Sequence, residues 1–299
     1  MTNYSRTPEP ADLRAVEQAC LLAGVVGAEA AVAVRLAENE TWRLPGQVVA
    51  RIAPVGQFAA AQREVEVATW LLESGIPTVR PLDVRQPVTL EDGRPVTFWE
   101  ALPEHEHGTV TEVAALLRDL HALSPPPPFL RPLDPFVRIA DRLDKATTIR
   151  EADRGWLRGL HTELSTAWRA LPPGAPHSAL HGDAWRGNLV RTGIGPLMMD
   201  LERFSVGPPE WDLVSTAIGH TTTGSVSPRE YETFCAAYGA DVTQWTGYPV
   251  LAGIRELRMA TYAALHAARH PQWVDQAQYR IDCLRGRHGP RPWHWKGIL

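Results

Sequence analysis

Hydrophobic and polar positions alternate along the first hundred residues in the manner of a small sheet with attached helices. The 3.6-residue period predicts two helices, at 11–23 and 58–75, and the second ends on Gly75 with Pro77 just beyond. Runs with β-type alternation predict short strands at 31–36, 40–44, 47–53, 78–84 and 95–101. The turn sequences LPGQ and EDGR separate neighbouring runs, as expected for antiparallel strands.

After residue 102 the pattern becomes mainly helical. Thr109 followed by Glu112 predicts a capping box at the start of TEVAALLRDLHAL, and SPPPP ends that helix. Further helical runs cover 136–146, 153–171, 209–222, 228–238, 250–269 and 272–285. Two short β-type runs, NLVRT and PLMMD, flank a turn at Gly193–Gly195 within this helical part.

The change of pattern predicts an α+β protein of two lobes. A small sheet-rich N-terminal lobe is expected over residues 1–102, and a larger, mainly helical C-terminal lobe over residues 103–299. With 299 residues, 44% of them hydrophobic, the chain has enough apolar surface for a sizeable core.

Charge and composition exclude several classes of partner. A net charge of −4, from 30 basic and 34 acidic residues, gives no polycationic surface for nucleic acid or an anionic membrane. The most apolar window, ACLLAGVVGA, stops at Glu29 and is too short to span a membrane. The beginning, MTNYSRTPEPADL, lacks the apolar core of a signal peptide, and the three distant cysteines are expected to be buried free thiols. We therefore expect a cytoplasmic protein.

The stretch ALHGDAWRGNLV contains the chemistry that stands out in this chain. Asp183 lies five residues before Asn188, and Asp200 ends the apolar run PLMM that follows the predicted turn. Asp and Asn oxygens are hard ligands suited to Mg²⁺, which takes one or two carboxylates and completes its shell with phosphate oxygens and water. An acid beside an amide is also common in simple turns, so the spacing alone leaves both interpretations open.

These motifs resemble the signature of a known family. HGDAWRGN at 181–188, followed by MMDLERFSVGPPEWDL at 198–213, is similar to the aminoglycoside phosphotransferase family, which includes choline-kinase-like and other small-molecule kinases. The resemblance extends to the layout of most of the chain and implies a bilobal protein-kinase-like fold. Both motifs match the family pattern without gaps.

The resemblance implies a role for each residue of the two motifs. Asp183 is similar to the catalytic-loop acid that accepts the proton of the attacking hydroxyl, while Asn188 and Asp200 are similar to the two Mg²⁺ ligands. His181 is interpreted as a structural residue of the loop, and Asp212 resembles the buried aspartate that braces it. Asp212 is also compatible with a favourable acid in the first turn of a helix.

A kinase of this fold needs a cation on a strand, to bind the α- and β-phosphates, and a helix glutamate to bind that cation. Arg51 occupies the position where the family often has Lys, although an edge-strand surface arginine is the competing interpretation. Helical spacing places Glu64 among apolar residues and Glu66 on a solvated face, so Glu64 is the predicted partner of Arg51.

The remaining nucleotide contacts are less marked in the sequence. No Gly-x-Gly-x-x-Gly loop is present, and we expect the hairpin around Asn39, Glu40 and Thr41 to cover the phosphates instead. The segment TFWEALPEH is expected to join the lobes, with backbone groups of Glu100, Ala101 and Leu102 paired to the purine edge.

The predicted activity is transfer of the γ-phosphoryl group of ATP, or GTP, to a hydroxyl of a small molecule such as an antibiotic or related metabolite, with Mg²⁺. The alternative is an inactive nucleotide-binding pseudokinase, for which Arg51 in place of Lys is the one supporting feature. A metal-dependent hydrolase would need more His and Asp ligands than the sequence provides. The range 201–299 has ten basic and nine acidic residues, a balance that argues against a polycationic acceptor. The sequence leaves open which acceptor is used, which hydroxyl is phosphorylated and what the oligomeric state is.

Overall fold

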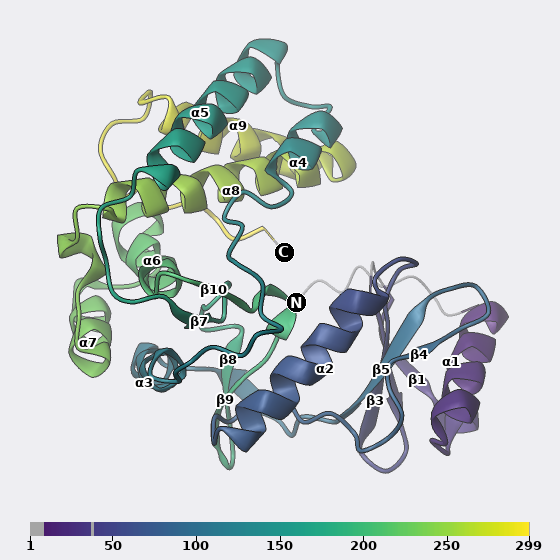
Figure 1. The fold of residues 1–299 in the computed structure, drawn as a ribbon. Coiled ribbons are helices and arrows are strands. Elements are labelled where there is room, and N and C mark those ends of the chain that lie inside the picture. The colour runs from purple at the N-terminus through teal and green to yellow at the C-terminus, as the bar shows by residue number, and fades with distance from the viewer. Residues whose placement is uncertain (1–8, 37–38, 299) are drawn as a thin grey trace. The chain divides into compact units, whose positions relative to one another are not determined.

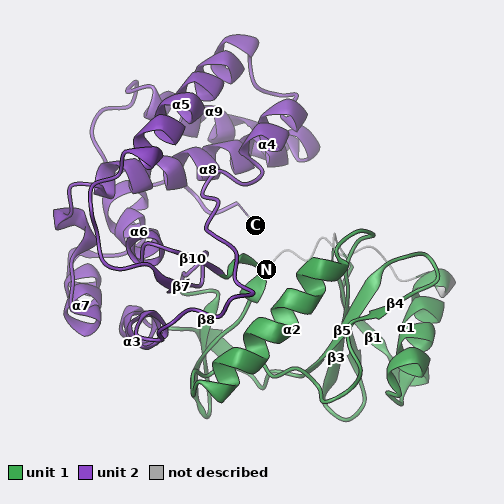
Figure 2. Ribbon diagram, in the orientation of Figure 1, with its two compact units in different colours: residues 1–108, 186–204 green, residues 109–185, 205–299 purple. Residues whose placement is uncertain are grey.

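The computed structural model describes residues 9–36 and 39–298, and its contacts divide the chain into two compact units (Figure 2). One unit comprises residues 1–108 and 186–204, and the other comprises residues 109–185 and 205–299. The first unit contains the larger sheet and the second is mainly helical, which confirms the predicted α+β class. The first eight residues, part of the segment expected to lack a signal peptide, lie outside the described residues.

The first unit is built on an antiparallel sheet with the order β1-β2-β3-β5-β4 (Figure 1). Its strands are β1 (Val32–Leu36), β2 (Glu40–Leu44), β3 (Val48–Ile52), β4 (Val88–Thr89) and β5 (Pro95–Glu100). Helix α1 (Pro10–Ala23) packs against one face of this sheet, and helix α2 (Phe58–Glu73) lies on the opposite face. The elements expected at 11–23, 31–36, 40–44, 47–53 and 58–75 are therefore present with small changes at their ends.

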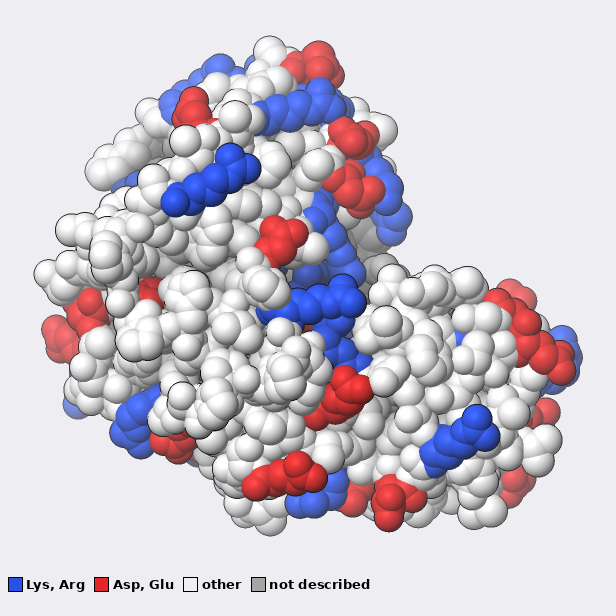
Figure 3. All heavy atoms as spheres, viewed as in Figure 1, with Lys and Arg blue, Asp and Glu red and all other residues white. Residues whose placement is uncertain are grey.

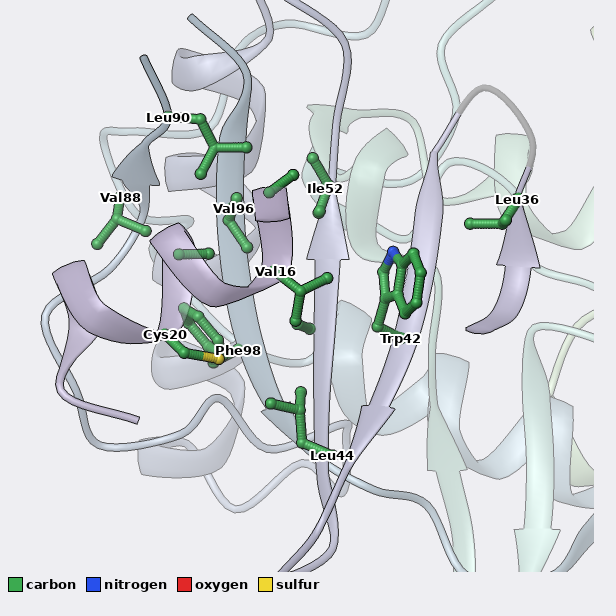
Figure 4. Packing of buried hydrophobic residues seen from close by; sticks show 13 residues of the cluster. Val16, Cys20, Leu36, Trp42, Leu44, Ile52, Val88, Leu90, Val96 and Phe98 are labelled. Atoms are coloured by element: carbon green, nitrogen blue, oxygen red, sulfur yellow. The ribbon is translucent and has the colours of Figure 1, made fainter. Parts of the chain in front are cut away.

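One face of this sheet packs against α1 and forms an apolar core, in which Trp42 and Phe98 are fully enclosed (Figure 4). Side chains alternate along β3, so that Ala50 and Ile52 belong to this core while Arg51 points to the opposite face. The opposite face carries the contact between Arg51 and α2. The alternation of the strand thus places a cation on the α2 side of the sheet.

A second sheet in the same unit has the order β6-β8-β9, formed by β6 (His105–His107), β8 (Leu189–Thr192) and β9 (Gly195–Met198). Its hairpin is tied to the segment after α2, because Thr78 Oγ1 and the amide of Val79 both donate to the carbonyl of Met198. These bonds explain why residues 186–204 group with the first unit, although the sequence assigned them to the second lobe.

The strand expected over 78–84 is wrong. The segment makes only isolated bridges, Thr78 with Met198 and Pro81 with Trp99. Two hydrogen bonds join the segment to β5, from the amide of Leu82 to the carbonyl of Phe98 and from the amide of Glu100 to the carbonyl of Arg80. The ladder ends there, because the next amide of β5, that of Phe98, donates to the Gln86 side chain instead. The apolar spacing was therefore correct in predicting an extended segment but not a regular strand.

The helices of the second unit are α3 (Val110–His121), α4 (Ile139–Lys145), α5 (Glu151–Arg169), α6 (Glu210–Ile218), α7 (Pro228–Tyr238), α8 (Tyr248–Arg269) and α9 (Val274–Leu284). Helix α8 packs against α4, α5, α6 and α9, and is the central helix of this unit (Figure 1). The capping box predicted at α3 is confirmed, since Thr109 Oγ1 accepts from the amide of Glu112 and the Glu112 side chain accepts from the amide of Thr109.

Two short strands of the second unit, β7 (Ser178–Leu180) and β10 (Ser205–Gly207), pair antiparallel. They were not predicted, because three-residue strands carry too few positions to show a period. They fix the backbone on either side of the segment 186–204 that belongs to the first unit.

The end of the chain packs back onto the second unit. The amide of Trp293 donates to the carbonyl of Thr222, and Arg291 forms an ion pair with the buried Glu256. Cys20 and Cys283 are buried and Cys235 is half-buried, all three as free thiols. Across the described residues, no helix combines the length and the apolar character needed to cross a membrane.

Candidate active site

The turn that carries Asp183 is held by a buried carboxylate. The segment leaves β7 at Leu180, and the amides of His181 and Gly182 both donate to Asp212, at 2.8 Å to Oδ2 and 2.8 Å to Oδ1. Gly182 has φ +80°, a backbone conformation that favours glycine. Because Asp212 lies in the first turn of α6 and is completely buried, this helix fixes the turn from below.

Charge and burial act in opposite directions on Asp212. Burial alone would raise the pKa of Asp212. The hydrogen bond with His121 Nε2, at 3.2 Å from Oδ2, and the positive charges of His121, His181 and Arg255 outweigh burial and lower the pKa below its usual value. The carboxylate is therefore ionised at neutral pH and satisfies the two amides of the turn. This arrangement agrees with the bracing position expected for Asp212, and His181 lies within the braced turn.

Replacing Asp212 by Asn is expected to destabilise the fold by about 3 kcal/mol. The Asn side chain has one oxygen and cannot accept from both backbone N–H groups, and its neutral charge disrupts the buried network of charged groups. Since the folded-state pKa is lowered, this stabilisation is complete above the unfolded value of about 4 and is lost as the pH falls through the folded value. Urea unfolding of wild type and variant from about pH 3 to about pH 8 measures the difference in their free energies of unfolding, which should persist at neutral pH and become smaller in acid.

Asp119→Asn is a matched control, since that carboxylate is exposed and pairs only with its neighbour Arg118 on α3. Its effect should stay within about 0.5 kcal/mol. Equal effects of the two substitutions would contradict a bracing role for Asp212.

Asp183 itself is held by an arginine from the central helix of the unit. Arg255 Nη1 donates to Asp183 Oδ1 at 3.1 Å, and Arg255 Nη2 donates to the carbonyls of Gly182 at 3.1 Å and Trp211 at 3.3 Å. The guanidinium lies 4.2 Å from the centre of the Trp211 ring, whose Nε1 also donates to Gly182. The Asp183 side chain remains 42% exposed, whereas that of Arg255 is 7% exposed. The acid is thus accessible and its partner is buried.

Arg255 was missed by the sequence analysis. The signal was present, because Arg255 and Glu256 stand between Ile254 and Leu257 in the buried stripe of a helix. Buried charges need partners, so each of them predicts an ion pair elsewhere in the chain. The sequence could not say that the partner of Arg255 is Asp183 and that of Glu256 is Arg291.

In the first unit, Arg51 and Glu64 form the ion pair that helical spacing predicts. Arg51 Nη1 donates to Glu64 Oε1 at 3.2 Å, with side chains 31% and 13% exposed. Glu66 instead accepts from Gln62 on the exposed side of α2. The pair joins the middle of β3 to α2.

The β8–β9 hairpin sets Asn188 beside Asp200. Leu189 pairs with Met198, and the amide of Met199 donates to the carbonyl of Asn188 at 2.9 Å, so Asn188 and Asp200 lie at the same open end of the hairpin. Asn188 is buried, and Asp200 adopts a left-handed conformation with φ +58°, which Asp tolerates better than most residues. The chain then turns sharply into the 3₁₀ turn Leu201–Arg203.

This end of the hairpin lies close to the Arg51–Glu64 pair, because α2 packs against the turn Leu201–Arg203. Burial raises the pKa of Glu64; Arg51 opposes this effect, while the negative charges of Asp200 and Glu202 add to it. Arg51 and Arg203 each pair with one acid here, Glu64 and Glu202, and Asp200 adds a further negative charge to this part of the first unit.

The residues predicted to meet the purine lie at the end of β5. The amide of Glu100 donates to the carbonyl of Arg80, and the amide of Ala101 donates to the carbonyl of Gln47 at 2.7 Å. Within Glu100–Leu102, these two amides are thus already used inside the first unit. Glu40, expected near the phosphates, is buried and pairs with Arg94 at 3.1 Å, so its side chain has a structural role.

The predicted residues fall into two sets. Arg51, Glu64, Glu100–Leu102, Asn188 and Asp200 belong to the first unit, and His181, Asp183 and Asp212 to the second. Among the described residues, no three His, Cys, Asp or Glu side chains are grouped in a way that could hold a metal ion. A protein-only metal cage is therefore not present in that part of the chain.

Comparison with known proteins defines the class. The model of the Phosphotransferase enzyme family matches residues 31–254, which include both motifs, and the chain belongs to this family. No curated protein matches the chain.

Solved structures share its fold. A choline/ethanolamine kinase family protein from Mesorhizobium loti is 18% identical, with a TM-score of 0.61 over 91% of this chain and 93% of that one. Aminoglycoside phosphotransferase APH(3'')-Id from Streptomyces rimosus is 21% identical, with a TM-score of 0.55 over 75% and 92%. APH(2")-IIia, solved with GDP and kanamycin, is 13% identical, with a TM-score of 0.63 over 93% and 100%. These likenesses confirm the predicted protein-kinase-like fold.

Proposed function

We propose that the protein transfers the γ-phosphoryl group of ATP, or GTP, to a hydroxyl group of a small molecule, in a Mg²⁺-dependent reaction. The family and the small-molecule kinases that share the fold support the reaction class. The relative solved with GDP and kanamycin supports a nucleotide donor and a small acceptor. The assignment of the two units to nucleotide and acceptor binding belongs to the same proposal.

The observation that carries the proposal is the register of the β8–β9 hairpin. It puts residues Asn188 and Asp200 at the same open end of the hairpin, and the 3₁₀ turn that follows packs against α2, the helix that presents Glu64 to Arg51. Two residues with oxygen-bearing side chains thus belong to the same unit as the Arg51–Glu64 pair, which supports a site for a divalent cation and phosphate there.

These residues fit a divalent cation. The donors are a carboxylate and an amide oxygen, which are hard ligands, and the pKa of Glu64 is raised by burial and by the charges of Asp200 and Glu202. A bound Mg²⁺ would neutralise that negative charge and polarise the phosphate oxygens that complete its shell. Asn188 and Asp200 would hold the ion, and no third protein ligand is needed for this mode of binding.

The chain's own residues then act on the acceptor. Asp183 takes the proton of the acceptor hydroxyl, whose oxygen forms a bond to the γ-phosphorus. The bond between the γ-phosphorus and the bridging oxygen breaks, and its electron pair leaves with the nucleoside diphosphate. Arg51 binds the α- and β-phosphates and is oriented by Glu64. The backbone of Glu100–Leu102 contacts the base through groups other than the amides of Glu100 and Ala101, which are bonded to Arg80 and Gln47. Asp212 with His181 keeps the turn of Asp183 in place.

Arg255 is expected to act as a positioning residue for Asp183. Arg255→Gln should lower kcat about 10- to 100-fold and leave KM for the nucleotide nearly unchanged, because the guanidinium fixes the carboxylate and does not touch the nucleotide in this scheme. Steady-state kinetics with any acceptor that is turned over measures the split. Arg255→Lys should recover part of kcat, since it keeps one charged donor. A Gln variant with raised KM and normal kcat would contradict this role.

The proposal is tested with wild type and Asp183→Ala, labelled ATP or GTP, Mg²⁺, and a panel of aminoglycosides, peptide antibiotics, nucleosides, sugars and amino alcohols. Transfer of label to at least one acceptor, lost in Asp183→Ala, supports it. Tight nucleotide binding without transfer to any acceptor or to water would support the pseudokinase alternative.

A further inference from the structure

The face of α8 next to Asp183 carries a second arginine. Arg258 follows Arg255 by one helical turn, and both guanidinium groups lie over the ring of the buried Trp211, at 4.2 Å and 5.6 Å from its centre. Arg258 Nη1 also donates to the carbonyl of Pro135, at 3.4 Å. A single indole ring is therefore in contact with both cations, one of which also donates to Asp183.

Helix α4 adds a third arginine to this face. Arg142 Nη1 donates to the carbonyl of Arg258 at 3.2 Å, and its guanidinium lies 5.3 Å from the centre of the Tyr262 ring. Tyr262 in turn packs against His266, one turn further along α8, with ring centres 4.3 Å apart. We call the set Arg142, Arg255, Arg258, Tyr262 and His266 the acceptor face. It combines guanidinium groups with aromatic rings.

The surroundings of this face are positively charged. Burial lowers the pKa of His266, and the positive groups of His270, Arg269 and Arg142 lower it further. The acids that α4 carries are engaged elsewhere, Asp141 with Lys145 at 2.8 Å and Asp144 with Arg158 at 2.7 Å. Figure 3 shows Lys and Arg side chains gathered below α4 on the viewed face.

We propose that the acceptor carries a carboxylate or phosphate group, which Arg258 and Arg142 bind while its hydroxyl meets Asp183. This inference rests on the proposed function and narrows its substrate class. Guanidinium groups bind such oxyanions in bidentate fashion, and the rings of Tyr262 and His266 pack against the apolar part of the molecule. A polycationic acceptor would meet like charges along the same helix.

Acceptors that differ only in charge test this proposal. Two matched sets are glucuronate, glucose and glucosamine, and 4-hydroxybutyrate, 1,4-butanediol and 4-aminobutanol. With labelled ATP and Mg²⁺, the anionic member should show a kcat/KM at least about tenfold above the neutral one, and the cationic member the lowest. Arg258→Gln should lower kcat/KM for the anionic member about 10- to 100-fold, a much larger loss than for the neutral member, so that the preference for the anion disappears.

Arg142→Gln should act in the same direction and serves as the second variant if Arg258→Gln does not fold. Arg158→Gln, an exposed arginine paired with Asp144, is the matched control and should change nothing. Preference for the neutral or cationic member, or equal loss for all three members in Arg258→Gln, would overturn the inference.

Binding without turnover separates this inference from the proposed function. Ligand-observed NMR on the whole protein detects millimolar binding of the same six compounds. If no compound is phosphorylated but glucuronate or 4-hydroxybutyrate binds in an Arg258-dependent way, the anion site stands and the kinase assignment fails. If neither transfer nor anion-selective binding is seen, the inference is wrong.

Discussion

Replacing Asp183 by Asn is expected to lower kcat for phosphoryl transfer by about 10²- to 10⁴-fold, the range that a positioned general base contributes. The substitution keeps the size of the side chain and an oxygen for Arg255 Nη1, but removes the carboxylate that we propose takes the acceptor proton. The protein should stay folded, because the Asp183 side chain is 42% exposed and Asn still offers an oxygen to Arg255, but some stability is lost since the buried guanidinium loses its charged partner. Release of labelled product under saturating nucleotide, with circular dichroism of the same sample, measures both effects.

The matched control for Asp183→Asn is again Asp119→Asn on α3, an exposed acid far along the chain from both motifs. It should retain wild-type kcat. A kcat for Asp183→Asn within a few-fold of wild type, in a folded protein, would remove Asp183 from the reaction and leave the braced turn as a structural feature alone.

Replacing Asp200 by Asn is expected to reduce transfer about 10³-fold or more at millimolar Mg²⁺. In the proposed reaction the substitution removes a charged metal ligand, and the metal would supply several kcal/mol of transition-state stabilisation. Asn accepts the left-handed backbone of this position, so the hairpin should stay intact. Activity measured against Mg²⁺ concentration should show a raised requirement for the metal, together with lower maximal activity.

Glu202→Gln is the matched control for Asp200→Asn, since Glu202 lies two residues further on in the 3₁₀ turn and contacts Arg203. It should change the metal requirement only slightly. If the two variants respond to Mg²⁺ alike, the assignment of Asp200 as a ligand is contradicted.

Much of the first unit could be predicted from the sequence because its elements repeat a short, regular period. The helices α1 and α2 and the strands β1, β2 and β3 were expected at nearly their observed bounds. The same periodicity distinguished Glu64 from Glu66, since only an inward acid on α2 needs a cation, and Arg51 is that cation. The local sequence pattern was therefore sufficient to predict the Arg51–Glu64 contact, because this contact depends only on which face of α2 an acid occupies.

The sequence could not supply contacts that depend on distant segments. The strands β7 and β10 are too short to show a period. The segment expected as a strand at 78–84 makes only isolated bridges, because the amide of Phe98 on β5 donates to the Gln86 side chain and not to this segment. The hairpin at 186–204 groups with the first unit through Thr78 and Val79, which no local pattern indicates.

The candidate site shows the same limit. The motif residues were found because their spacing is regular and resembles a family signature. Arg255 lies 72 residues after Asp183 and is joined to it only by the packing of α8 against the turn after β7. Its burial in an apolar stripe marked it as a charge in need of a partner, but only the fold identifies that partner.

The most direct test of the account is a crystal structure of the protein with Mg²⁺ and a non-hydrolysable ATP analogue. We predict a metal ion about 2.0–2.1 Å from oxygens of Asn188 and Asp200 and from phosphate oxygens, with Arg51 on the α- and β-phosphates and the Asp183 carboxylate facing the γ-phosphate. An Asp200 side chain directed away from the nucleotide, or a triphosphate bound out of reach of Asp183, would contradict it.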